Sequence, residues 1–299
     1  MNREPVPEPM LTQILAEAIR EENIEAGKRP KAFDTIFRHS DSGNCIRAMA
    51  LSHWDYPETD PPDLADELVM WIGRTVHEFF QRALVKRYPD AQVEVKVRHG
   101  DLTSGHLDAL VVIHAEGVTI CYELKTKNAT AFDKAAGQDR RKWIMAEAEG
   151  PKLGEIMQGG LNALAAGADL LIIGYMGTEA LSKGFADKHG LDELRRIMAE
   201  WHYSRAEFEP LALAELDRLA EGRAWIDDDQ VPPRWGLNDK GYSVELEPAR
   251  GQYPCSYCRY RSLCGFAGPG PVPHPIPGWR QWMNGDMAGL LEESIRATD

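Results

Sequence analysis

The sequence predicts an α/β fold in which a small mixed β-sheet is flanked by helices, and three patterns indicate it. Apolar and polar residues alternate along Val93–Val97 and again along Gly105–Val112, as expected of half-buried strands. Residues 63–88 carry apolar side chains at helical spacing. The apolar run Leu170–Met176 suits a buried central strand.

Helices and turns are expected before this sheet. Residues 9–26 have the apolar spacing of an amphipathic helix, and Ser42 is placed to cap a second helix that runs to about Ser52. Pro57–Pro62 is rich in turn-forming residues and leads into the helix over residues 63–88.

A β-hairpin carries the chemistry. His114–Gly117 is short and polar and suits a turn between the strand of Asp108 and a strand over Tyr122–Thr126. Glu123 and Lys125 are two positions apart, so they share a face and can lie beside Asp108. The other face of the first strand would be apolar, with Leu107, Ala109, Val111 and Ile113.

Two adjacent carboxylates repel each other, and a divalent cation or a proton relieves that repulsion. Lys125 beside them could hold a water molecule and stabilise charge on an attacked phosphate. The alternative is a simple cross-strand ion pair on a solvated face of the sheet.

The rest of the chain is expected to be mostly helical. One helical stretch runs to about Ala166, and residues 188–226 form two more helices, the second from Ala212 to Trp225. The acidic run Asp227–Asp229 is expected to be a helix end and an exposed turn. Gly268–Gly278 is rich in proline and glycine and predicts an extended linker, followed by a short docking helix.

His77 would be presented near the hairpin by the helix over residues 63–88, where a lone histidine is otherwise a packing or capping residue. The order Gly73-x-x-x-His77, Gly105-x-x-Asp108, Glu123-x-Lys125 resembles the RecB-type branch of the PD-(D/E)xK nuclease superfamily, over roughly residues 40–268. The resemblance implies a nuclease domain over residues 1–268 and a linker and tail over 269–299. It implies that Lys125, Glu123 and Asp108 are catalytic and that Mg²⁺ or Mn²⁺ is bound by His77, Asp108, Glu123 and the carbonyl of Leu124.

Members of that family often carry a Gln-x-x-x-Tyr motif on a helix that borders the DNA. Gln158 matches its first position, but Asn162 stands where the tyrosine would be. Gln158 is therefore a candidate DNA-binding residue, with a surface glutamine on a helix as the alternative.

Five cysteines suggest a second centre. Cys255, Cys258 and Cys264 lie within ten residues, and Cys45 could complete a set of four thiolates for zinc or an iron–sulfur cluster. A disulfide network is less favoured in a chain without a secretory signal. Cys121 is expected to be a small buried apolar residue in the second strand.

The spacing of these cysteines resembles that of AddB-type nucleases and of RecB-like nucleases that take part in CRISPR spacer acquisition. The resemblance implies a [4Fe-4S] cluster, in preference to zinc, in a helical lobe that joins the N-terminal and C-terminal parts of the chain. Its expected role is structural.

A formal net charge of −13 argues against an extended surface that coats nucleic acid. A narrow cleft needs only local positive charge, and Arg140, Arg141 and Trp143 could touch phosphates and stack a base. A solvated helix face is the equal alternative for these residues. Arg74, one turn before His77, is a second candidate.

Together the resemblance implies a metal-dependent DNA exonuclease, favouring single strands and the 5′ to 3′ direction, in repair, recombination, phage DNA metabolism or CRISPR adaptation. Its partners would be DNA and proteins of those pathways, and a homo-oligomer is conceivable. The alternatives are a catalytically silent DNA-binding or assembly subunit and a zinc-stapled interaction module. We expect a cytoplasmic protein without a signal peptide, membrane span or phosphate-binding loop for ATP.

Overall fold

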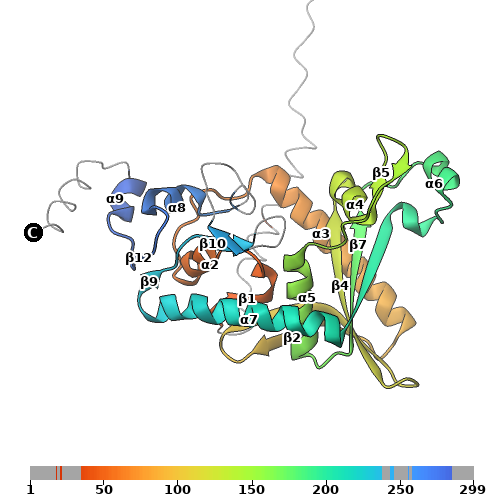
Figure 1. Cartoon of the computed structure of the whole chain (residues 1–299), viewed down its shortest axis with the longest axis horizontal. Coiled ribbons are helices and arrows are strands. Elements are labelled where there is room, and N and C mark those ends of the chain that lie inside the picture. Colours follow the sequence, from red (N-terminus) through yellow and green to blue (C-terminus); the bar gives the residue numbers. More distant parts are fainter. Residues whose placement is uncertain are drawn as a thin grey trace, which may run out of the picture.

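A mixed sheet forms the core of the larger part of the molecule, on the right in Figure 1. The computed structural model describes residues 35–237, 243–245, 255 and 258–284, together with Ala18 and Glu21. In this part of the chain the strands lie in the order β1, β3, β4, β7, β8, with β2 also paired to β3. Pairing is parallel between β1 and β3 and between β4 and β7, and antiparallel elsewhere. The strands are β1 Phe37–Arg38, β2 Gln92–His99, β3 Thr103–Ile113, β4 Val118–Lys127, β7 Leu170–Gly177 and β8 Met198–Ser204.

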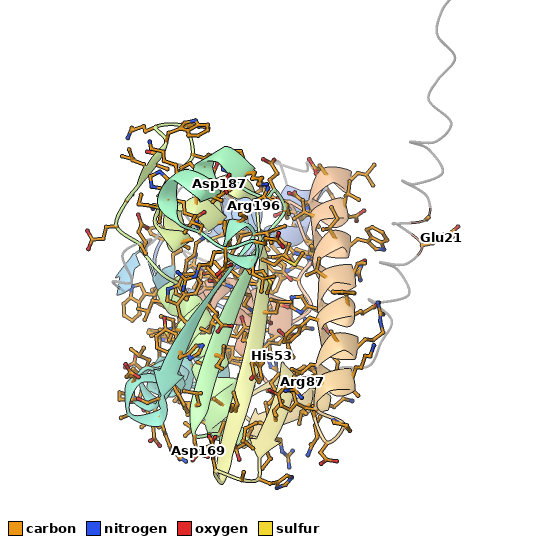
Figure 2. All side chains as sticks on the ribbon, turned by 90° about the vertical axis from the view of Figure 1, so that its right-hand side faces the viewer. Glu21, His53, Arg87, Asp169, Asp187 and Arg196 are labelled. Atoms are coloured by element: carbon orange, nitrogen blue, oxygen red, sulfur yellow. The ribbon has the colours of Figure 1, made fainter. Side chains whose placement is uncertain are left out.

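Helices cover both faces of this sheet. On one face α3 lies alongside the strands (Figure 2), and its Leu84 packs with Ala109 and Val111 of β3. On the other face α5 and α7 bury a larger cluster that includes Cys121 and Phe208. The bounds are α3 Leu64–Arg87, α5 Leu153–Ala165 and α7 Arg205–Asp227. The predicted α/β fold with a small mixed sheet flanked by helices is therefore confirmed.

One end of the sheet carries short elements. These are α4 Ala129–Ala136, the two-stranded β5 Gln138–Asp139 and β6 Ile144–Met145, α6 Lys183–His189 and the 3₁₀ helix η2 Leu194–Arg196. Figure 2 shows Asp187 and Arg196 at this end and Asp169 at the opposite end.

A smaller lobe lies beside the sheet (Figure 1). Its core joins Leu51 and Tyr56 near the start of the described chain to Leu263 and Ile276 near its end. The lobe contains α2 Ile46–His53, α8 Arg261–Ala267, α9 Trp279–Met283 and the strand pairs β9 Gln230–Val231 with β12 Val272–Pro273 and β10 Trp235–Leu237 with β11 Ser243–Glu245. The 3₁₀ helix η1 His39–Asp41 precedes α2 and packs against α5 and β3.

The strands predicted at Val93–Val97, Gly105–Val112 and Leu170–Met176 are confirmed, as are the hairpin turn, the helix over residues 63–88 and the helix end at Asp227. The helix predicted over residues 9–26 and the tail beyond residue 284 lie outside the described residues. None of the described helices is long and apolar enough to cross a membrane.

Several expectations were wrong. The first of the two helices predicted within residues 188–226 is instead η2 followed by β8, an edge strand whose Trp201 packs against Tyr175 of the neighbouring β7. Pairing with β7 here overrides the local spacing of apolar residues. The stretch after β4 is not one helix, because α4 ends at Gly137 in the left-handed conformation and the β5–β6 hairpin follows. Ser42 does not cap α2, since its hydroxyl donates to the His39 carbonyl.

Candidate active site

Helix α3 brings His77 to the sheet. Asp63 caps its N-terminus by accepting hydrogen bonds from the backbone N–H groups of Ala65 and Asp66, and Asp66 completes a capping box. His77 Nδ1 lies 3.0 Å from Asp108 Oδ1. One turn further on, Gln81 donates to the Asp108 carbonyl at 3.4 Å.

Asp108 interrupts the pairing of the two hairpin strands. Opposed residues of β3 and β4 run from Ile113, which faces Val118, to Ala109, which faces Tyr122. Beyond this pair the side-chain carboxylate of Asp108, and not a backbone carbonyl of β3, accepts a hydrogen bond from β4. Its Oδ2 accepts the backbone N–H of Leu124 at 2.7 Å. The predicted apolar face of β3 is broken here, because Leu107 packs on the α5 side of the sheet whereas Ala109 and Val111 pack under α3.

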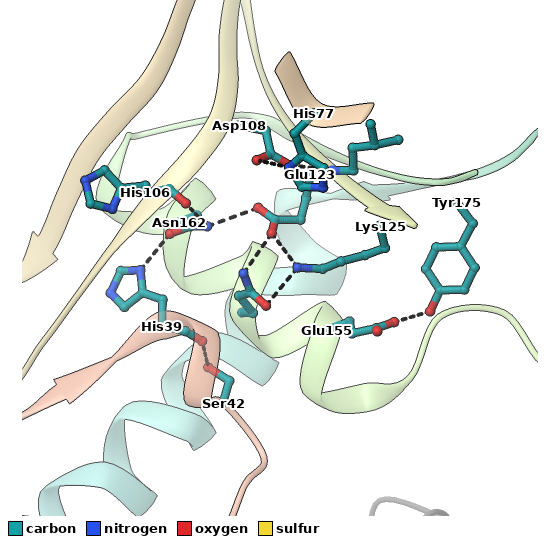
Figure 3. Close-up of polar contacts among 12 residues, drawn as sticks. His39, Ser42, His77, His106, Asp108, Glu123, Lys125, Glu155, Asn162 and Tyr175 are labelled. Atoms are coloured by element: carbon teal, nitrogen blue, oxygen red, sulfur yellow. Dashed lines mark hydrogen bonds and ion pairs between the residues drawn. The ribbon is translucent and has the colours of Figure 1, made fainter. Parts of the chain in front are cut away.

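Glu123 is the centre of the polar contacts between β4 and α5 (Figure 3). Its Oε1 accepts hydrogen bonds from Lys125 Nζ at 2.7 Å and from Gln158 Nε2 at 2.8 Å. Gln158 Oε1 in turn accepts from Lys125 Nζ at 2.9 Å. One step along, Lys127 forms an ion pair with Glu155. Residues further along β4 therefore pair with residues nearer the N-terminus of α5.

Glycines let α5 lie this close to the sheet. A Cβ placed on Gly159 would be 2.9 Å from the side chain of Leu171 in β7. A Cβ on Gly160 would be 3.3 Å from Ala212 in α7. The Gly159-Gly160 pair therefore allows α5 to fit between the sheet and α7 while Gln158 faces β4.

Burial controls the charges at this site. Burial raises the pKa of Glu123, the positive charge of Lys125 opposes that rise, and Asp108 adds to it. Burial alone would lower the pKa of Lys125, but Glu123 raises it above its usual value. Burial likewise opposes protonation of His77, but its hydrogen bond to Asp108 raises its pKa. Lys125 is therefore a protonated donor at neutral pH.

Asn162, which replaces the family's tyrosine, contacts the same carboxylate. Its side chain is fully buried, and Nδ2 donates to Glu123 Oε2 at 3.1 Å. Its Oδ1 lies 2.7 Å from Nδ1 of His39, a buried residue of η1. His39 was not predicted from the sequence, because it lies in a short 3₁₀ segment and meets Asn162 only through tertiary packing.

His39 should make the stability of the protein depend on pH. Burial lowers the pKa of His39 from 6.5 to about 4, so the folded protein excludes a proton that the unfolded chain binds below pH 6.5. The free energy of unfolding should be unaffected by this group above pH 6.5 and should fall by about 2 kcal/mol from there to about pH 5. Urea unfolding of the wild type and of His39→Asn at pH 7.5 and pH 5 measures this difference. Equal losses in both proteins would contradict it.

The four cysteines predicted to act together line one cavity of about 570 Å³. The described residues form no disulfide there, since Cys45, Cys255, Cys258 and Cys264 are all free thiols. Burial raises the pKa of Cys45 to about 12, and burial together with neighbouring thiols raises the pKa of Cys255 and Cys258 to about 11. Cys121 lies elsewhere, fully buried in the sheet core as predicted.

Arg47 is a buried cation beside this cavity. Its side chain is fully buried and donates to the carbonyls of Pro232 at 2.7 Å, Gly268 at 2.5 Å and Pro269 at 3.2 Å, and also to that of Gly270. Its Nη1 lies 3.8 Å from Cys264 Sγ. No carboxylate of the described residues forms an ion pair with it. A buried guanidinium without an anionic partner is costly, so negative charge in the cavity would stabilise it.

In the described part of the chain, no group of three or more His, Cys, Asp or Glu side chains is arranged to hold a metal ion. At the carboxylates, every oxygen of Asp108 and Glu123 already has a hydrogen-bond partner within the protein. The structure brings His77, Asp108, Glu123 and Leu124 together, and their role as metal ligands stays a prediction. The donor chemistry of two buried carboxylates and an imidazole fits a divalent cation.

The predicted DNA-binding residues of the basic run lie in the β5–β6 hairpin, not on a helix face. Arg140 is paired with Asp133 at 2.5 Å and with Glu179 at 3.3 Å. Arg141 is exposed, and Trp143 is 46% exposed at the tip of the hairpin. Arg74 is exposed on α3, one turn from His77. Gln158 contacts Lys125 and Glu123, so it is not a surface glutamine.

No protein-family model and no curated protein matches this sequence. Among solved structures, the crystal structure of SSO0001 aligns with a TM-score of 0.49 and 18% identity, over 86% of this chain and 97% of that one. An alkaline exonuclease from Laribacter hongkongensis aligns with a TM-score of 0.34 and 15% identity, over 64% of this chain and 91% of that one.

Proposed function

We propose that this chain is a metal-dependent nuclease that hydrolyses phosphodiester bonds in DNA. The observation that carries the proposal is the meeting of five polar side chains from four separate elements at one point of the sheet. They are His77 on α3, Asp108 on β3, Glu123 and Lys125 on β4, and Gln158 on α5. Such a set combines anionic ligands, a protonated donor and an amide in a mostly buried site.

The residues divide into two roles. His77, Asp108, Glu123 and the carbonyl of Leu124 would hold Mg²⁺ or Mn²⁺, and the imidazole nitrogen suits Mn²⁺ in particular. When bound, the cation supplies positive charge that lowers the pKa of a water molecule, so that the water can lose a proton and attack a phosphate at neutral pH.

Lys125 would stabilise the charge that develops on the attacked phosphate, because its protonated amine is held in place by Glu123 and Gln158. Gln158 shares its amide between these two groups and would keep both in position.

The cysteine cavity would hold the second centre. Four free thiols from two distant parts of the chain supply a donor set that favours zinc or an iron–sulfur cluster, and either centre with four thiolates carries negative charge next to Arg47. We propose [4Fe-4S] in preference to zinc, on the resemblance of the cysteine spacing to AddB-type and CRISPR-adaptation nucleases. Metal binding here would replace the thiol protons.

We further propose action at DNA ends, with single strands and the 5′ to 3′ direction favoured. Arg74, Arg141 and Trp143 are exposed and would contact the DNA, whereas the ion pairs of Arg140 leave it a weaker candidate. The pathway would be recombination, repair, phage DNA metabolism or CRISPR adaptation, with proteins of that pathway as partners.

Digestion of matched linear and circular single-stranded DNA with Mn²⁺ tests the function. We expect the linear strand to be shortened from its 5′ end and the circle to remain intact. Strands labelled at the 5′ end and at the 3′ end distinguish the two directions of digestion. Omission of Mn²⁺ and Mg²⁺ is the control and should stop the reaction. Binding of DNA in a gel-shift assay without any cutting would overturn the proposal and support the catalytically silent alternative.

A further inference from the structure

The second oxygen of Glu123 is held by a buried chain of hydrogen bonds that ends in η1. Glu123 Oε2 accepts from Asn162 Nδ2, which also donates to the carbonyl of His106 at 3.3 Å. Asn162 Oδ1 lies 2.7 Å from His39 Nδ1. Figure 3 shows Asn162 between His39 and Glu123. His39 and Asn162 are fully buried and Glu123 is 3% exposed, so water does not compete for these contacts.

The chemistry of these four groups determines where the protons lie in this series of hydrogen bonds. The Glu123 carboxylate and the His106 carbonyl accept only, so both must face the amide nitrogen of Asn162. The amide oxygen of Asn162 then faces His39, which must donate from Nδ1. The other ring nitrogen, Nε2, is buried and makes no hydrogen bond within the part of the chain that the structure describes. His39 is therefore the neutral tautomer that carries its proton on Nδ1.

The backbone of β3 leaves room for this bond. A Cβ placed on Gly105 would lie 2.7 Å from His39 Nδ1 and 2.8 Å from Asn162 Oδ1, which are the two atoms that the bond joins. Any side chain at this position would push the two atoms apart. Gly105 is the glycine of the Gly-x-x-Asp motif, so the motif supplies Asp108 and also the space for the partner of Glu123.

We propose that His39 and Asn162 are positioning residues, which lock the carboxylate of Glu123 in the orientation needed to bind the divalent cation. This inference rests on the proposed function. The Nδ1–H group of His39 holds the oxygen end of the Asn162 amide in place, and the nitrogen end of that amide occupies one side of Glu123 Oε2. The remaining lone pair of Oε2 is thereby fixed, while Oε1 is held by Lys125 and Gln158.

Two substitutions at one position separate positioning from packing. His39→Asn keeps a donor where Nδ1 stands, whereas His39→Leu removes it and leaves the buried amide oxygen of Asn162 without its donor, so that the amide can shift away from Glu123. Binding of Mn²⁺ to the full chain without DNA, measured from the electron paramagnetic resonance of free Mn²⁺, should weaken about 10- to 100-fold in His39→Leu. His39→Asn should stay close to the wild type, and Gly105→Ala should resemble His39→Leu.

Phe185→Leu is the control for general destabilisation, since Phe185 is equally buried but lies on α6 away from these contacts. It should lower the melting temperature without weakening Mn²⁺ binding. Nitrogen-15 NMR of labelled histidines gives a readout that does not depend on metal. The histidine signal that is missing from the spectrum of His39→Asn belongs to His39, and in the wild type it should show a proton on Nδ1.

The outcomes are distinct. A proton on Nε2 of His39, or equal Mn²⁺ binding by His39→Leu and His39→Asn, would overturn the positioning role while leaving the proposed nuclease intact. A wild-type protein that binds no Mn²⁺ at all would overturn the proposed function and this inference together.

Discussion

Replacement of Lys125 by methionine is expected to lower Mn²⁺-dependent DNA cleavage by at least about 10²- to 10³-fold, the usual cost of removing one donor to a developing negative charge. The fold should survive, because Gln158 and Asn162 still donate to Glu123, and burial already favours uptake of a proton by that carboxylate. The rate of release of labelled nucleotides at saturating Mn²⁺ measures the effect.

Lys134→Met is the matched control, since Lys134 is an exposed residue of α4 and its ion pair with Glu149 lies on the surface. It should cleave DNA at the wild-type rate. The partner carboxylate is best tested as Glu123→Gln, because Glu123→Ala would leave the amine of Lys125 buried without its counter-charge, and that loss destabilises the fold. Undiminished cleavage by folded Lys125→Met would remove Lys125 from the catalytic site.

Loss of one cysteine of the cavity is expected to have the largest effect on stability. Anaerobically purified wild-type protein should be brown, and Cys264→Ser should lose both the colour and the bound iron. The melting temperature should fall by ten degrees or more, since the centre ties together segments far apart in the chain and Arg47 loses the negative charge beside it. Visible absorption, iron and sulfide content and thermal unfolding measure these changes.

Cys121→Ala is the control for this experiment. Cys121 is a free, buried thiol outside the cavity, so the variant should keep the colour and the iron of the wild type. A colourless wild-type protein with stoichiometric zinc would overturn the iron–sulfur assignment and retain the thiolate centre. Wild-type protein that carries neither metal would remove the centre altogether.

The sequence predicts those parts of the fold in which local pattern and tertiary contact agree. The hairpin of β3 and β4 has alternating apolar residues and a glycine in its turn, and β7 is apolar throughout because it lies between two other strands. β8 could not be predicted in this way, since it lies beside β7 at the edge of the sheet, and its few apolar residues also fit a helical spacing.

The residues of the candidate site also differ in whether local pattern predicts their contacts. Asp108, Glu123 and Lys125 lie on two adjacent strands, so strand geometry alone predicts that they meet. His39 and Asn162 meet through the packing of η1 against α5, and no local periodicity encodes that contact. Gly105 was the available hint, because a glycine inside a strand often marks a close approach of another group.

Arg47 has a consequence for where the folded unit ends. The carbonyls of Pro269 and Gly270 accept hydrogen bonds from its guanidinium, and the backbone N–H of Ile276 donates to the hydroxyl of Tyr56. A chain shortened after residue 268 would therefore strip partners from a buried cation and from a buried phenol. The proline-rich segment that resembles a dispensable linker forms part of the wall of the lobe, and a minimal fragment for expression has to include it.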